Sequence, residues 1–155
     1  MLFDPILNNV DGERIIAALD SRWREEDPVT VGNVGCLSLQ VRMLFDLHTV
    51  PDPDSPEGRD PGMWQAVGIE VALCLYGEVL ARESLWGIWL WLGSRDKVEY
   101  RGFPDYVKST IVDLTHEANS RLEHEIGRRL DRLSSAQSLV KAGYRLPGTH
   151  ASVSI

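Results

Sequence analysis

Cysteine is scarce in this sequence, which contains only Cys36 and Cys74 among its 155 residues. Two cysteines cannot build a disulfide scaffold, and because they do not stand in a Cys-x-x-Cys pair they provide no redox or zinc motif. We therefore expect both residues to be buried free thiols.

Long apolar segments are also missing. The longest uncharged run in the tryptophan-rich part of the chain is Ser84–Ser94, which is far shorter than the roughly 18 residues of a membrane-spanning helix. Asp4 and Pro5 stand where a secretory signal peptide would place basic residues and then an apolar run. These absences predict a cytoplasmic, soluble protein with no membrane contact.

Basic residues are too few and too dispersed for a general nucleic-acid-binding protein. The net charge is −7, and residues 1–63 contain 12 acidic and 5 basic residues. Binding to nucleic acid requires clustered lysine and arginine that neutralise phosphates, so no nucleic-acid partner is expected. The acidity of the first part of the chain instead favours attraction to a basic protein.

Familiar catalytic motifs are missing as well. The chain has no Gly-x-Ser-x-Gly motif and no cysteine with an orienting histidine nearby, so it shows no residues for nucleophilic catalysis. Gly32-Asn33-Val34-Gly35 is not followed by the Lys-Ser/Thr pair of a phosphate-binding loop and indicates a turn. We expect no cofactor, and an interaction protein is favoured over an enzyme.

Tryptophan, by contrast, is concentrated in one stretch. Trp64–Arg82 has apolar residues at helical spacing, which predicts an amphipathic helix. Leu85–Leu92 is apolar except at Gly87 and favours a strand buried on both faces, joined by a turn to a half-exposed strand around Val98. An alternative interpretation continues the helix through Leu92. The stretch contains four of the five tryptophans: Trp64, Trp86, Trp89 and Trp91.

The residues before this stretch predict a helix, a hairpin and a loop. Asp11 begins an amphipathic helix that ends before Pro28. Val29–Val31 and Leu37–Phe45 form a hairpin across Gly32-Asn33, and the second of these segments alternates apolar and polar residues. Residues 49–62 contain four prolines and four acidic residues, which predicts an exposed loop.

The residues after the stretch predict helices. Phe103-Pro104-Asp105 begin a long helix in which apolar residues recur every three or four positions as far as Leu133. Ser134 with Gln137 has the pattern of a cap for a further short helix, which would end at Gly143. Residues 148–155 form a small, polar tail that we expect to fray.

Together these elements predict an α+β protein. Residues 1–147 would form a single domain with an antiparallel sheet of two hairpins packed by three helices, in the order α-β-β-α-β-β-α. The alternative is a mainly α-helical protein.

One cluster of residues has the side-chain types of a metal site. Asp113, His116 and Glu117 lie close in sequence to Glu123 and His124 on the last predicted helix. His116 and His124 are eight residues apart and therefore do not share one helix face, so a closed site would need ligands from another segment. The other interpretation is a solvated helix face carrying Glu117–Arg121 and Glu125–Arg129 pairs. The candidate ligands in this cluster are His116, Glu117 and His124. A metal-dependent enzyme is therefore the alternative function.

Two family resemblances bear on function. The segment from Arg42 to His48 resembles the Arg-x(4–6)-His signature of HEPN ribonucleases, which would imply an all-α bundle in which both side chains converge on a phosphodiester. The size, acidity and element order are similar to those of type III secretion chaperones, which would imply a binding role.

The expected function is that of a small acidic binder. It would dock on a basic partner protein and mask or inhibit it, as immunity proteins, antitoxins and phage-encoded inhibitors do. Most tryptophans are expected in the core; Trp89 and Trp91, if uncovered, would form a patch for the partner or for a homodimer through this strand. The acidic candidates for partner binding, which would mainly raise the association rate, are Asp20, Glu25, Glu26, Asp27, Asp52, Asp54, Glu57 and Asp60.

Overall fold

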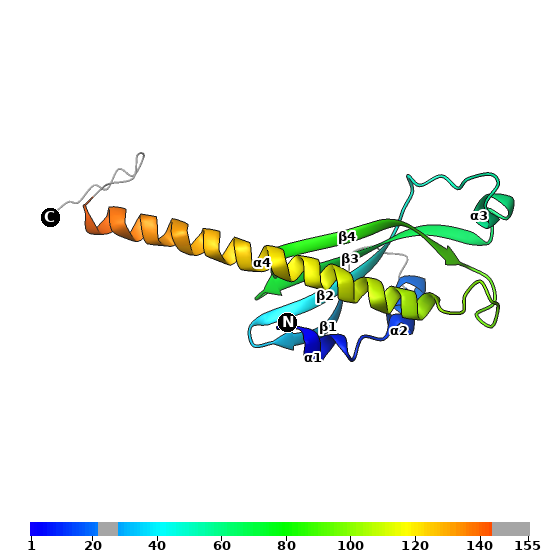
Figure 1. Cartoon of the computed structure of the whole chain (residues 1–155), viewed down its shortest axis with the longest axis horizontal. Coiled ribbons are helices and arrows are strands. Elements are labelled where there is room, and N and C mark those ends of the chain that lie inside the picture. Colours follow the sequence, from blue (N-terminus) through cyan, green and yellow to red (C-terminus); the bar gives the residue numbers. More distant parts are fainter. Residues whose placement is uncertain (22–27, 144–155) are drawn as a thin grey trace. The chain divides into compact units, whose positions relative to one another are not determined.

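Four antiparallel strands form one sheet in the computed structural model, which describes residues 1–21 and 28–143, without the side chains of residues 19–21 (Figure 1). The strands pair in chain order: β1 (Val29–Val34), β2 (Leu37–Phe45), β3 (Trp64–Leu75) and β4 (Glu78–Trp91). The helices are α1 (Asp4–Leu7), α2 (Gly12–Ser21), α3 (Pro56–Arg59) and α4 (Phe103–Lys141). The prediction of an α+β fold with a sheet of two hairpins is confirmed.

The second hairpin lies earlier in the chain than predicted. Trp64–Leu75 is strand rather than helix, and it pairs with β4 through a turn at Tyr76 and Gly77. Both turn residues have positive φ angles, of 48° and 86°, as a two-residue hairpin turn of the right-handed sheet requires. The helix prediction failed because residues 66–74 of β3 are all buried, so that the strand shows no two-residue alternation.

The segment around Val98, predicted to be a strand, consists of turns. Leu85–Leu92 does contribute to a strand, β4, but the partner of β4 is β3. The Tyr100 amide donates to the Lys97 carbonyl at 3.1 Å, and the buried Tyr100 ring lies 6.3 Å from that of Phe103. These contacts lead the chain into α4. The alternative helix through Leu92 is therefore also wrong.

The first hairpin is confirmed, with its turn three residues later than predicted. Val34 pairs with Leu37 across Gly35-Cys36, and Gly35 has a positive φ of 59°. Gly32 instead lies at a register shift within β1 and packs against Ile6 of α1, where a Cβ atom would approach a methyl carbon to 2.7 Å. Cys36 is therefore exposed, contrary to expectation, while Cys74 is buried as expected, and burial raises the pKa of its thiol.

Helices α2 and α4 begin where predicted, whereas α1 was not predicted. Asp11 accepts hydrogen bonds from the amides of Glu13 and Arg14 and so caps α2. α4 runs without a break from Phe103 to Lys141, so Ser134 lies inside one helix and caps no second one. The chain then turns at Gly143, which has a φ of 72°.

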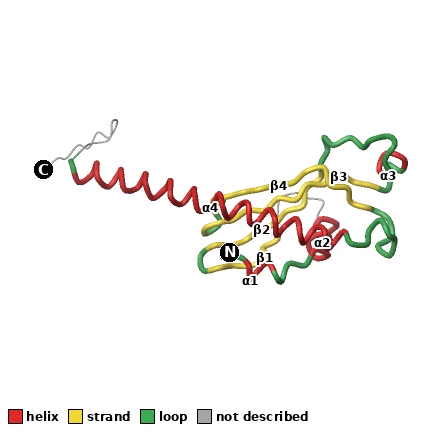
Figure 2. The backbone as a smooth tube through the Cα atoms, viewed as in Figure 1, coloured by secondary structure: helices red, strands yellow, loops and turns green. Residues whose placement is uncertain are grey.

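The helices supply the core on one face of the sheet. Alternate residues of β2 and β3, including Val41 and Ile69, pack with Ile16 of α2 and Ile111 of α4. The chain divides into two compact units, residues 1–122 and 123–155. All strands found in the described residues lie in the first unit (Figure 2). Every buried apolar side chain found in the described residues also belongs to this unit.

Candidate functional site

The other face of the sheet carries a different set of residues, and we call it the open face. Arg42 pairs with Glu70, and Leu44 pairs with Gly68. These positions alternate with the core residues Val41, Met43, Val67, Ile69 and Val71, and successive strand residues point to opposite faces. The open face thus lies opposite the buried core.

All four described tryptophans lie on the open face. Trp64 pairs with Trp91, and Ala66 pairs with Trp89, so these side chains continue the row of Gly68 and Glu70 along β3. The Trp64 and Trp91 rings meet edge to face at 5.1 Å. None of the four tryptophans is fully buried, although Trp91 packs against the core cluster. The expectation that most of them are core residues is therefore wrong.

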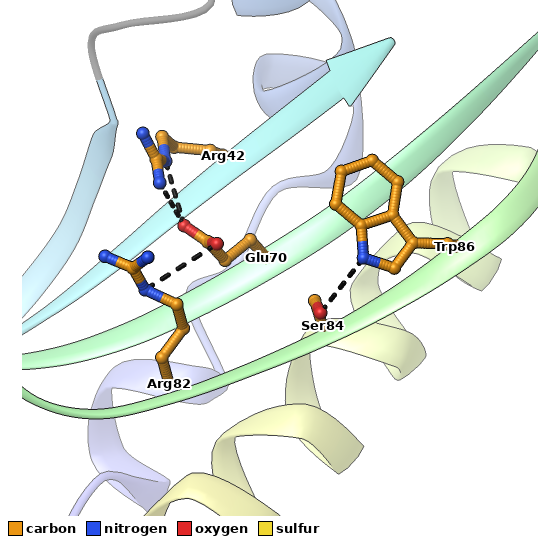
Figure 3. Close-up of polar contacts among 5 residues, drawn as sticks. All are labelled: Arg42, Glu70, Arg82, Ser84 and Trp86. Carbon is orange, nitrogen blue, oxygen red and sulfur yellow. Dashed lines mark hydrogen bonds and ion pairs between the residues drawn. The ribbon is translucent and has the colours of Figure 1, made fainter. Parts of the chain in front are cut away.

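Trp86 is held in a defined position on this face (Figure 3). Its indole N–H donates to the Ser84 hydroxyl at 3.1 Å. Its ring lies directly over Gly68, because a Cβ atom at Gly68 would come within 2.3 Å of the ring. The side chain remains 47% exposed. A large aromatic surface is thus fixed in place and still open to contact.

An ionic cluster occupies the middle of the open face (Figure 3). Glu70 on β3 accepts from the Arg42 Nε atom at 3.0 Å, and its other oxygen lies 3.6 Å from the Arg82 Nε atom on β4. Glu70 is 10% exposed, whereas Arg42 and Arg82 are 27% and 50% exposed. A nearly buried carboxylate in a central strand needs such partners. The cluster therefore joins three strands and borders a hollow of about 110 Å³ lined by Gln40 and Ala72.

The acidic loop is anchored to the tryptophan-bearing end of the sheet by Asp46. This carboxylate accepts from the Thr49 hydroxyl, the His48 and Thr49 amides and, at 3.1 Å, the Gly87 amide of β4. These hydrogen bonds lower the pKa of Asp46, and the bond from the Thr49 hydroxyl makes the largest contribution. Gly87 has a φ of 75° and stands at a register shift in β4, which directs its N–H group to Asp46 instead of to β3.

The loop itself presents carboxylates between β2 and β3. Residues 49–62 contain α3, which Ser55 caps by accepting from the Gly58 amide at 3.1 Å. Asp52, Asp54 and Asp60 are exposed, and Glu57 is half-buried. The Leu92 amide donates to the Met63 carbonyl, so the loop returns to the sheet where Trp64 pairs with Trp91. A hollow of about 480 Å³ lined by Phe45–Thr49 and Trp86 lies at the base of the loop.

The remaining acidic candidates cannot be added to this site. Glu25, Glu26 and Asp27 lie outside the described residues, as does the side chain of Asp20. Residues 148–155, predicted to be a frayed tail, also lie outside them. The candidate site therefore consists of the loop carboxylates and the tryptophans.

The metal candidates lie on α4, and the ribonuclease signature begins on the strand β2. The His116 imidazole lies 3.6 Å from the Asp4 carboxylate. Arg121 forms an ion pair with Glu83 and not the expected one with Glu117. Arg129 donates to Glu125 at 2.8 Å, as expected. Within residues 1–21 and 28–143, no three His, Cys, Asp or Glu side chains are placed to share a metal ion. Arg42 lies on a strand and binds Glu70, so the all-α arrangement implied by the HEPN resemblance is wrong.

Comparison with known proteins gives no match: no family model, no curated protein and no solved structure matches this chain. Neither resemblance drawn from the sequence gains support from these comparisons. In the part of the chain that the structure describes, none of the helices combines the length and apolar character needed to cross a bilayer.

The sequence pattern indicated the acidic loop, Trp89 and Trp91 as candidates, but it did not indicate Trp86 or the ionic cluster. Gly68 and Glu70 are the residues whose pattern in the sequence could have indicated these contacts. A glycine and a charged residue inside an otherwise apolar strand indicate that large side chains from neighbouring strands lie over that strand.

Proposed function

We propose that this protein is a binding module that docks a basic partner protein on the tryptophan-bearing end of the open face and thereby masks or inhibits it. The observation that carries the proposal is the position of Trp64, Trp86, Trp89 and Trp91, which share the sheet face opposite the core and are all partly accessible. Contiguous exposed aromatic surface is costly in water and is typical of interaction sites.

Tryptophan supplies the affinity in this proposal. Residues that dominate binding energy at interfaces are enriched in tryptophan, tyrosine and arginine, and they work best when neighbouring contacts exclude water around them. Trp86 is held by Ser84 and Gly68, so little side-chain entropy is lost on binding. Arg42 and Arg82 lie on the same face and can extend the contact.

The acidic loop supplies attraction to a basic partner. Asp52, Asp54 and Asp60 are exposed and lie in the loop that joins β2 to Trp64 of β3. Carboxylates at the rim of an interface chiefly raise the association rate, and this effect weakens as salt screens the charges. A bound partner would thus meet a charged rim and an aromatic centre.

The proposal is tested by affinity capture from the native host lysate followed by binding kinetics with the purified partner. Trp86→Ala/Trp89→Ala should reduce affinity at least tenfold, mainly through faster dissociation. Asp52→Asn/Asp54→Asn/Asp60→Asn should slow association at low salt and have little effect at high salt.

Matched controls remove the same groups elsewhere. Tyr76→Ala deletes an exposed aromatic ring at the β3–β4 turn, and Glu99→Gln/Asp113→Asn/Asp131→Asn neutralises three exposed carboxylates outside the loop. Both controls should bind like the unmodified protein. Equal binding by the tryptophan variant, a captured partner that is acidic, or the absence of any captured protein would each count against the proposal.

A further inference from the structure

The hollow at the base of the acidic loop combines a carboxylate with an aromatic surface. Its volume is about 480 Å³, and it is lined by Phe45–Thr49 and Trp86, which is a size typical of sites that hold small organic groups. Trp86 lies over Gly68, donates to Ser84 and is 47% exposed (Figure 3). The aromatic wall of the hollow is therefore in place before any ligand binds.

The negative charge of the hollow is not neutralised by a cation. Asp46 accepts its hydrogen bonds from neutral groups, which are the Thr49 hydroxyl and the backbone amides of His48, Thr49 and Gly87. These bonds lower the pKa of Asp46, so the carboxylate is ionised at neutral pH. Of the described residues that line the hollow, none is a lysine or an arginine. A full negative charge and an indole ring thus share one hollow.

This combination favours a cation, and a guanidinium over an ammonium. Cations are attracted to the face of an aromatic ring, most strongly to that of tryptophan. A carboxylate has about four acceptor positions, and the bonds to Thr49, His48 and Gly87 occupy those of Asp46. Asp46 therefore attracts a cation through its charge alone. An ammonium is strongly hydrated and depends on direct hydrogen bonds, whereas a guanidinium is weakly hydrated and stacks on aromatic rings.

We propose that the hollow lined by Asp46 and Trp86 binds an arginine side chain of the partner. This site rests on the proposed function, because the basic partner protein supplies the arginine. The guanidinium stacks on the Trp86 indole, and the negative charge of Asp46 stabilises it there. The apolar stem of the arginine packs against Phe45, which lines the same hollow.

An NMR titration of the isotope-labelled full chain with a blocked arginine, Nα-acetyl-arginine methylamide, tests the site. The signals of the Trp86 indole N–H and the Gly87 amide should shift in a saturable way. The citrulline counterpart has the same shape without the charge and should cause no saturable shift, and the lysine counterpart should bind more weakly than the arginine. Equal shifts with citrulline, equal affinity for lysine, or no saturable shift with arginine would each overturn the proposal.

His48→Arg tests the hollow without changing Asp46 or Trp86. The exposed His48 lines the hollow, so the substitution places a cation of the chain's own there. Binding of the blocked arginine should weaken by at least about tenfold, because like charges in one hollow repel. Val50→Arg is the matched control, since Val50 is 84% exposed in the same loop and is not a lining residue. Equal binding by His48→Arg and the control would contradict the site.

The same variants, measured with the captured partner, separate this site from the proposed function. His48→Arg should reduce affinity for the partner, as Trp86→Ala/Trp89→Ala does, and Val50→Arg should not. Full affinity of His48→Arg beside reduced affinity of the tryptophan variant would overturn the arginine site and leave the proposed function standing. Full affinity of both variants would overturn both.

Discussion

Asp46 shows how one side chain positions the candidate site. Its two oxygens accept from the residues that begin the acidic loop and from the Gly87 amide. The positive φ of Gly87 turns this amide out of the strand ladder, and Asp46 supplies a hydrogen-bond acceptor for it. The Asp46 carboxylate therefore fixes the start of the loop to β4 beside Trp86. It is also the hydrogen-bond acceptor for the Gly87 amide at the register shift.

Asp46→Asn should destabilise the protein in a pH-dependent way. The lowered pKa of Asp46 in the folded protein means that its stabilising effect is complete above pH of about 4, the pKa of an unperturbed aspartate. The effect is lost as the pH falls through the lower, folded-state pKa. Urea unfolding at neutral pH and near pH 2 should show a large difference between variant and unmodified protein only at neutral pH. An equal difference at both pH values would contradict this explanation.

Gly68→Ala should displace the Trp86 ring. The added Cβ atom would lie 2.3 Å from the ring, and overpacking of this kind costs about 1–3 kcal/mol. Urea unfolding should show the loss, and tryptophan fluorescence should shift to the red as the indole becomes more exposed. Gly62→Ala, where nothing lies within 4 Å of the new Cβ, is the matched control and should leave both measurements unchanged.

At the scale of elements, β3 is the segment whose secondary structure the sequence pattern predicted wrongly. Its residues Ala66, Ile69 and Leu73 match a helical face as well as they match a strand, because the residues between them are also mostly apolar or small. Residues such as Gly68 and Ala72 are buried here by the side chains of neighbouring strands. Only the pairing of β3 with its neighbouring strands shows that their side chains cover these residues. β2, whose open-face residues are polar except for Leu44, was predicted correctly from its alternation.

Within α4, Gly127→Ala should stabilise the second half of the helix. Nothing lies within 4 Å of the new Cβ atom, and alanine is favoured over glycine in a helix interior by about 1 kcal/mol. Hydrogen exchange of the amides around residue 127 should become slower. Gly143→Ala should have no such benefit and should fray the helix end, because Gly143 has a φ of 72°, which an L-residue adopts at a cost.

At the scale of the whole molecule, stability is concentrated in the first unit. Every buried apolar residue among those described has a number of 122 or lower, so residues beyond this point add little to the core. A chain ending after Gly127 should keep the near-ultraviolet circular dichroism and thermal midpoint of the full chain within a few degrees. A loss of cooperative unfolding on truncation would show that the second unit contributes to the core after all.

The sequence by itself determined the fold class, the first hairpin, the starts of helices α2 and α4 and the exposed acidic loop. In these segments alternation, helical spacing and turn residues are local signals that need no partner. The tertiary structure decided the identity of β3 and the accessibility of the tryptophans. Burial of a strand on both faces, and the choice of which face the helices cover, depend on side chains that are distant in sequence. For Trp86 and Glu70, the deciding contacts come from neighbouring strands, and no local pattern contains them.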